Sequence, residues 1–324
     1  MYSEESGNVF GTVSRMIDYN SAQALENLDW LKTQMDSYFF VTMQEEAEAL
    51  FNLAAGLNNL GHNQKLTVAD REKTLILARL NIPGSLYDTL RTLQERDISY
   101  AEFTHSHGVV PGLGRELEVQ RFDFDRKDHR EIADAAVTIP TEIRDGIAAA
   151  LQDSYPLFET AEMDRLLNTL WLNNENYVRI SPPQQVAQIL WLYQQANHQG
   201  GICLDVEEAP GDAERQETRV MFAVGNPPQR DFLVQIMEVF NRLELGVRRA
   251  YCLTISNGVH PYFLGTFYVR NRIAGTLAKG TPLFDRLQKE LYNTQILSTA
   301  SHTYREFVTK RLMSGEEGSL VNAF

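Results

Sequence analysis

Two stretches of the sequence, FTHSHGVVP at residues 103–111 and LTISNGVHP at residues 253–261, share the pattern T-x-S-x-G-V-x-P. Each shared residue of the second stretch lies 150 positions after its counterpart in the first. Glycine adopts the positive φ that tight turns require, and proline pre-sets its own φ for a turn. The repeat therefore predicts one turn built twice, at the end of a strand in each of two related units.

The segments around the first stretch predict a β-α-β-β-α unit. Short apolar or alternating runs are typical of strands, and leucines three and four residues apart are typical of helices. By these criteria the strands are KTLILARLN, ISYAEFTHSHG and RELEVQRFDFDR, and the helices are IPGSLYDTLRTLQERD and IPTEIRDGIAAALQD.

The segments around the second stretch predict the same order with one more strand in front. The strands are GICLDVEE, TRVMFAVGN, VRRAYCLTISNG and YFLGTFYVRN, and the helices are PPQRDFLVQIMEVFNRLE and TPLFDRLQKELYN. A second pair of matching residues supports the duplication, because Asn81-Ile82-Pro83 and Asn226-Pro227-Pro228 both stand between a strand and a helix.

The remaining segments predict helices, so the fold class is α+β. The helical pieces include SAQALENLDWLKTQM, MQEEAEALFNLAAGLNNLG with Gly61 as its C-cap, and SPPQQVAQILWLYQQANHQGG. The expected organisation is a helical N-terminal segment, a first unit, a helical linker, a second unit and a C-terminal tail, at residues 1–62, 63–155, 156–200, 201–300 and 301–324.

Composition narrows the function classes. With 43% hydrophobic residues the chain can bury a sizeable core, and no apolar run approaches the roughly 20 residues that span a bilayer. The net charge of −13 disfavours nucleic acid and anionic membranes as partners, since both attract basic surfaces. The acidic start is unlike a secretory signal, and Cys203 and Cys252 stand in apolar strands, so we expect a cytoplasmic protein with buried, reduced cysteines.

The units resemble ACT-type regulatory domains, a ferredoxin-like fold. In NIPGSLYDTL the residues Asn81, Pro83, Gly84 and Ser85 look like that family's turn, where an amide or acidic residue precedes Pro-Gly and a helix starts at once. The resemblance implies that an amino-acid effector binds near this turn. The second copy departs from the pattern, because Gln229 stands where Gly84 does.

The order of parts resembles the N-terminal region of the large NAD-dependent glutamate dehydrogenases. The similarity rests on SPPQQVAQILWLY between the units and on RRAYCLTISNG followed by YFLGTFYV. It implies a regulatory and assembly region in a homo-oligomer, with the residues after 300 leading to a catalytic region downstream. The parent enzyme would convert L-glutamate, water and NAD to 2-oxoglutarate, ammonia and NADH.

The sequence itself lacks the motifs of nucleotide chemistry. A dinucleotide site needs a glycine-rich turn at a helix N-terminus, and neither G-x-G-x-x-G nor a P-loop occurs. We therefore expect no catalytic residues and no cofactor in this chain, with NAD belonging to the parent enzyme. The alternative is a free-standing amino-acid-sensing module with no enzyme attached, and a metal-dependent hydrolase ranks third.

His105 and His107 are the candidate metal ligands. Two residues apart on a strand they would share one face, and His129 or Asp128 could supply a third ligand to Zn²⁺. The second copy has Ile255 and Asn257 at the positions of the two histidines. A duplicated scaffold that lacks them does not need them, so a polar strand end is the preferred interpretation.

Each predicted sheet has its own helices on one side only. The opposite face must then be covered by the N-terminal helices, by the helix at 181–199, or by another copy of the sheet, because exposed apolar faces are costly. Val220, Phe222, Leu264 and Phe267 of the second unit cannot all lie on one face if strand alternation holds.

Overall fold

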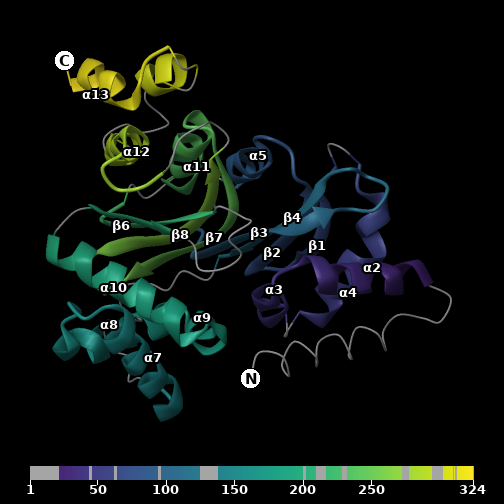
Figure 1. Ribbon diagram of the computed structural model, residues 1–324, viewed down its shortest axis with the longest axis horizontal. Helices are drawn as coiled ribbons and strands as arrows, with labels where there is room; N and C mark the ends of the chain where they lie inside the picture. The colour runs from purple at the N-terminus through teal and green to yellow at the C-terminus, as the bar shows by residue number, and fades with distance from the viewer. Residues whose placement is uncertain are drawn as a thin grey trace. The chain divides into compact units, whose positions relative to one another are not determined.

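The computed structural model divides into two compact α+β units, with unit 1 formed by Met1–Pro83 and Ile98–Asp125 and unit 2 by Gly84–Asp97 and Arg126–Phe324 (Figure 1). The structure describes residues 22–43, 46–61, 64–93, 96–124, 138–199, 202–208, 217–227, 232–271, 277–293, 302–308, 310 and 312–323.

Within unit 1 four strands pair antiparallel in the order β1-β2-β4-β3, and we call these four strands the first sheet. Its strands are β1 (Leu66–Asp70), β2 (Thr74–Leu80), β3 (Tyr100–Val109) and β4 (Glu116–Asp123). Strand β2 reads TLILARL and is buried along almost its whole length, as expected for a strand between two neighbours.

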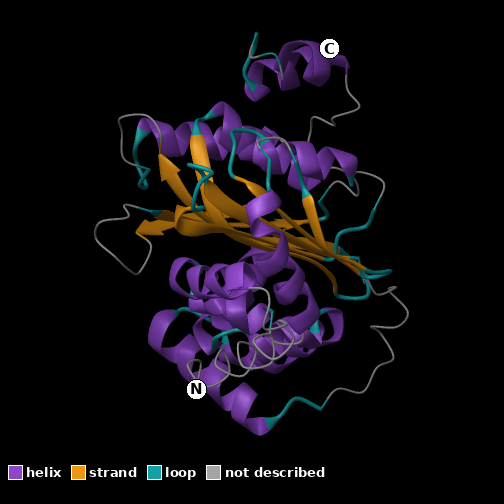
Figure 2. Ribbon diagram, turned by 90° about the vertical axis from the view of Figure 1, so that its right-hand side faces the viewer, coloured by secondary structure: helices purple, strands orange, loops and turns teal. Residues whose placement is uncertain are grey.

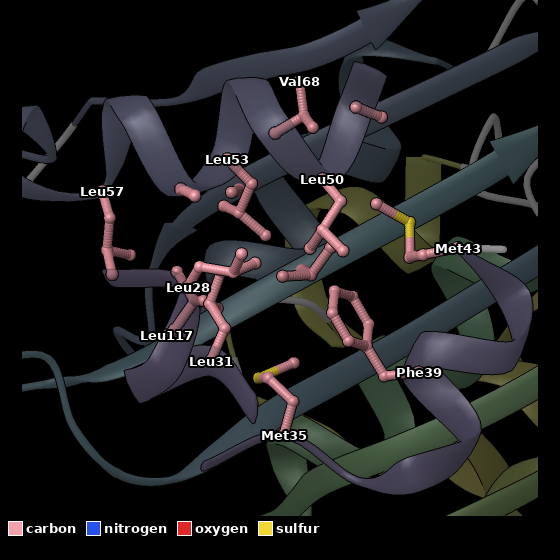
Figure 3. Close-up of a cluster of buried hydrophobic side chains, with 14 of the residues drawn as sticks. Leu28, Leu31, Met35, Phe39, Met43, Leu50, Leu53, Leu57, Val68 and Leu117 are labelled. Atoms are coloured by element: carbon pink, nitrogen blue, oxygen red, sulfur yellow. The ribbon is translucent and has the colours of Figure 1, made fainter. Parts of the chain in front are cut away.

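Helices from the N-terminal segment cover one face of this sheet. They are α2 (Ala22–Gln34), α3 (Ser37–Thr42) and α4 (Ala47–Gly56), followed by one 3₁₀ turn, η1 (Leu57–Asn59). Figure 3 shows Leu28 and Leu31 of α2 with Leu50 and Leu53 of α4, beside Leu117 of β4. These helices and the first sheet therefore share one hydrophobic core.

Within unit 2 four strands pair antiparallel in the order β5-β6-β8-β7, and we call these four strands the second sheet. Its strands are β5 (Ile202–Glu208), β6 (Thr218–Gly225), β7 (Leu245–Ser256) and β8 (Pro261–Asn271).

Helices cover both faces of the second sheet. On one face lie α8 (Met163–Asn173) and α10 (Pro183–Gln199), and on the other α11 (Phe232–Arg242) and α12 (Pro282–Asn293). Neighbouring residues of β8 show the two faces: Tyr262 packs against Tyr193 of α10, with ring centroids 4.8 Å apart, whereas Phe263 packs against Phe232 of α11 at 5.1 Å. Figure 2 shows strands with helices on either side.

The remaining elements of unit 2 are helical. Helix α5, the connection between β2 and β3, belongs to this unit and packs beside α11. These elements are α5 (Ser85–Thr92), α7 (Thr141–Ser154), η2 (Thr160–Glu162), α9 (Glu175–Ile180), the π-helical turn η3 (Tyr304–Val308) and α13 (Gly315–Ala323). Among the described residues no helix is long and apolar enough to cross a bilayer.

The two units repeat one plan. In chain order, helices precede two strands, one helix and two more strands both in residues 22–123 and in residues 141–271, although the first such helix, α5, belongs to unit 2. The strand order is first, second, fourth, third in both. The hydrogen bond from the Asn81 amide to the Glu116 carbonyl recurs between Asn226 and Pro261, both 145 residues further on.

The two T-x-S-x-G-V-x-P stretches both lead from the third strand of a unit into the fourth, but one residue out of register. Thr104 pairs with Val119, whose counterpart in unit 2 is Leu264. Thr254 pairs instead with Phe263, the residue before Leu264. The shift follows from an irregularity in β3, which has extra residues between His105 and Val109.

Three details of the sequence prediction need correction. The first unit also has an extra leading strand, β1, so the β-α-β-β-α order was incomplete there. Helix α4 ends at Gly56 and continues as η1, so Gly61 is not its C-cap. Gly258 has the expected positive φ of 87°, but Gly108 is the penultimate residue of β3 and is not among the residues with positive φ; the turn after it uses Gly112 and Gly114 instead.

Two of the three elements that the sequence predicts as covers for a sheet face do cover one. The N-terminal helices cover one face of the first sheet and α10 covers one face of the second. Val220, Phe222 and Phe267 share the face that packs on α11, and Leu264 lies on the opposite face.

Candidate functional site in the first unit

A row of charged side chains crosses the sheet of unit 1 on the face away from α2 and α4. Arg79 of β2 pairs in register with Glu118 of β4, and Glu118 pairs with His105 of β3. Because side chains alternate along a strand, these three point away from Leu117 and Val119, which face the helices. All three are no more than 4% exposed.

Hydrogen bonds connect the row. The Nε2 atom of His105 lies 2.9 Å from Oε2 of Glu118, and Gln120 donates to the other oxygen of the same carboxylate. Gln120 is fully buried, and its Oε1 atom has no hydrogen-bond partner within the part of the chain that the structure describes.

Unit 2 shows that the fold does not require these charges. In the matching register the row reads Val224, Phe263 and Thr254, and Phe263 packs against Phe232. Burying charges is costly unless they are paired, whereas an apolar row at this place adds to the core. The charged row is therefore the feature by which unit 1 differs most clearly from its sister.

A buried carboxyl group lies on the opposite face of the same sheet. Glu102 of β3 accepts hydrogen bonds from the hydroxyls of Tyr100, at 3.1 Å, and Thr42, at 3.4 Å. Burial raises the pKa of Glu102 to about 7, although the nearby Arg121 guanidinium opposes the shift. Arg121 in turn donates to the Thr42 carbonyl at 3.0 Å and to Asp123 at 3.2 Å. This carboxyl group can exchange a proton near neutral pH.

The turn predicted to bind a ligand has a well-defined local geometry. Asn81 is held by Glu116, which accepts from its backbone amide at 2.8 Å and from its side-chain amide at 3.0 Å. Pro83 is exposed, and Gly84 has φ +85° with no atom within 4 Å of the place a Cβ would occupy. Ser85 begins α5 and is buried, and its carbonyl accepts from the Thr89 hydroxyl. The boundary between the two compact units falls between Pro83 and Gly84.

Among the described residues, His105 and His107 contact different carboxylates. His105 contacts Glu118, whereas the Nε2 atom of His107 lies 3.2 Å from Asp36, just before α3. The extra residues of β3 interrupt strand alternation here, so spacing of two no longer places both rings on one face. Asp128 and His129 lie outside the described residues.

Sequence reasoning missed a different group of possible metal ligands, in unit 2. Glu159, Glu162 and His198 offer ligand atoms that all lie within 4.8 Å of one another. The two glutamates are close together in the sequence, but the histidine is far from them, so no local spacing could have revealed the group.

Neither cysteine is suited to nucleophilic chemistry. Both are buried, and burial raises the pKa of Cys203 to about 11 and that of Cys252 well above its usual range. The thiolate, which is the reactive form, is therefore scarce at neutral pH.

No family model, no curated protein and no solved structure matches this chain. Its function is therefore inferred from the duplicated fold and from the chemistry of the sites above.

Proposed function

We propose that this chain is the regulatory and assembly region of a large NAD-dependent dehydrogenase that acts on glutamate or a related amino acid. The observation that carries the proposal is the repetition of one plan in two units, with the same strand order and a shared register of β2–β4 and β6–β8. Tandem α+β units of this kind support the resemblance to paired ACT-type domains, whose part is to sense amino acids.

The directions of the strands favour a regulatory role for this chain over a catalytic role. Dinucleotide-binding folds hold the cofactor at the carboxyl ends of parallel strands. Within each of the two sheets every neighbouring pair of strands is antiparallel. NAD binding and hydride transfer are accordingly assigned to a separate catalytic region of the parent enzyme.

The effector site in this proposal is the turn from Asn81 to Ser85. An amino-acid carboxylate would accept hydrogen bonds from backbone amides at the start of α5, and the open space beside Gly84 would allow close approach. The charged row, present in unit 1 alone of the two sister sheets, supports the view that unit 1 is the specialised copy.

The second candidate is a free-standing amino-acid-sensing module. The coverage of unit 2 favours it, because helices of the same chain pack on both faces of the second sheet.

Immunoprecipitation from native cells, with an antibody raised against this chain, separates the two candidates. The first predicts a polypeptide much larger than 36.9 kDa that forms NADH from glutamate and NAD. A product of 36.9 kDa without dehydrogenase activity would leave only the sensing module.

Calorimetry on the isolated chain tests both the regulatory role and the effector. We expect no binding of NAD, and binding of one amino acid from a panel that includes glutamate. Gly84→Ala should weaken that binding, whereas Gly146→Ala, in the middle of α7, should leave it unchanged. Stoichiometric binding of NAD would contradict the proposed division of labour.

A further inference from the structure

The acidic turn η2 and the last turn of α10 meet in unit 2. His198 directs both ring nitrogens at carboxylates, with Nε2 at 2.7 Å from Oε2 of Glu162 and Nδ1 at 3.8 Å from Oε1 of Glu159. A histidine nitrogen and two carboxylates are a ligand set for a first-row divalent cation.

A buried side chain holds the backbone of Glu159 and the carboxylate of Glu162 in place. Gln194 is 1% exposed and lies one helical turn before His198. Its Oε1 accepts from the Glu159 backbone amide at 3.0 Å, and its Nε2 donates to the Glu159 carbonyl at 3.3 Å and to Oε2 of Glu162 at 3.1 Å. The backbone that carries the first glutamate and the carboxylate of the second are thus fixed to α10.

The outer hydrogen bonds that a metal-binding carboxylate needs are already present. Arg165 donates to Oε1 of Glu162 at 2.5 Å while Gln194 donates to Oε2. Ligating carboxylates in proteins are supported by outer-shell donors in this way.

We propose that Glu159, Glu162 and His198 bind Zn²⁺, with water completing the coordination shell. Ligand atoms of a tetrahedral zinc site lie about 3.4 Å apart, given bonds of about 2.0–2.2 Å. The ligand atoms now lie up to 4.8 Å apart. A rotation of the Glu159 side chain, which is 64% exposed, would bring them to the shorter distance. The imidazole ligand selects zinc over magnesium and calcium, which prefer oxygen ligands.

The bound ion would brace unit 2. It would join the turn between α7 and α8 to the end of α10, the helix that covers one face of the second sheet. Binding to the folded state alone stabilises that state in proportion to ligand concentration, so Zn²⁺ should raise the unfolding temperature of the chain.

Titration of the full chain with Zn²⁺, followed by calorimetry, tests the site, and Co²⁺ provides a visible absorption probe of tetrahedral geometry. We expect one ion per chain. Glu159→Gln and His198→Gln should each weaken binding by about tenfold or more and reduce the rise in unfolding temperature. The matched controls are Glu142→Gln and His260→Gln, exposed residues outside the cluster, which should change neither.

Two results would overturn the proposal. One is the absence of binding at millimolar Zn²⁺, which would leave the cluster as a hydrogen-bonded ion-pair network only. The other is equal affinity in the site variants and the parent chain, which would place the ion on other groups. Because both site variants change partly exposed side chains, circular dichroism should show that they remain folded.

Discussion

The Nε2 atom of His105 lies 2.9 Å from Oε2 of Glu118, and both side chains are buried in the sheet of unit 1. Removing one member of such a pair leaves the other polar group buried without compensation. We expect Glu118→Leu to lower the free energy of unfolding by about 3–5 kcal/mol, measured by urea denaturation.

A second variant separates the charge effect from the effect of packing. Arg79→Val, His105→Thr and Glu118→Phe together would copy the row of unit 2, where Val224, Thr254 and Phe263 stand. The triple variant should be less destabilised than Glu118→Leu, because it leaves no member of the row charged. A loss of less than about 1 kcal/mol in Glu118→Leu would show that the row is not energetically coupled.

Glu102 should make stability depend on pH. Burial raises its pKa to about 7, so the folded state favours the protonated form. For an acid with a raised folded-state pKa, the stabilisation is fully present below the unfolded-state pKa and is lost as pH rises through about 7. Glu102→Gln removes this loss. From pH 5 to pH 8, the free energy of unfolding of the variant should therefore rise by roughly 1–3 kcal/mol relative to that of the parent chain.

Denaturation of both proteins at the two pH values measures that difference. Glu142→Gln, at an exposed position in the first turn of α7, is the control and should show the same pH dependence as the parent chain. A Glu102→Gln variant whose stability runs parallel to that of the parent would mean that Glu102 does not titrate in this range.

Two glycines should respond to alanine in opposite ways. Gly84 has φ +85°, which costs an alanine about 1 kcal/mol or more even though the space beside it is open. Gly146 lies inside α7, where alanine meets Pro183 only at ordinary contact distance and should stabilise by about 0.5–1 kcal/mol. Thermal unfolding of both variants checks the signs, and equal effects would contradict the left-handed turn before α5.

The sequence predicts most of the fold because its strands alternate clearly and its helices have leucine stripes. Strand β1 was missed because its five residues, LTVAD, end on an acid and are too short to show a period. The register slip between the repeats was missed because the irregularity of β3 has no marker in the sequence, where Thr104 and Thr254 look equivalent.

The candidate sites were harder to predict for a physical reason. Arg79, His105 and Glu118 each follow and precede apolar or neutral residues, which is also the pattern of a solvated strand face, so their burial is visible only in the folded sheet. Glu159, Glu162 and His198 are brought together by packing of α10 on the preceding turn, which no local pattern encodes.

We expect the second sheet to remain monomeric only when helix α10 covers one of its faces. A fragment of residues 201–297 lacks it and would expose Tyr262, Leu264 and Met221, which are no more than 5% exposed in the whole chain. Each such side chain is stabilised by roughly 1.5–3 kcal/mol on burial, so this fragment should bind an apolar dye and self-associate.

A fragment of residues 138–297 retains α7, α8 and α10, and should remain monomeric without binding dye. Light scattering and dye fluorescence on the pair give the comparison. If both fragments were monomeric and free of dye, the face under α10 would need no cover; if both associated, the second sheet would have a further apolar surface that its own helices do not protect.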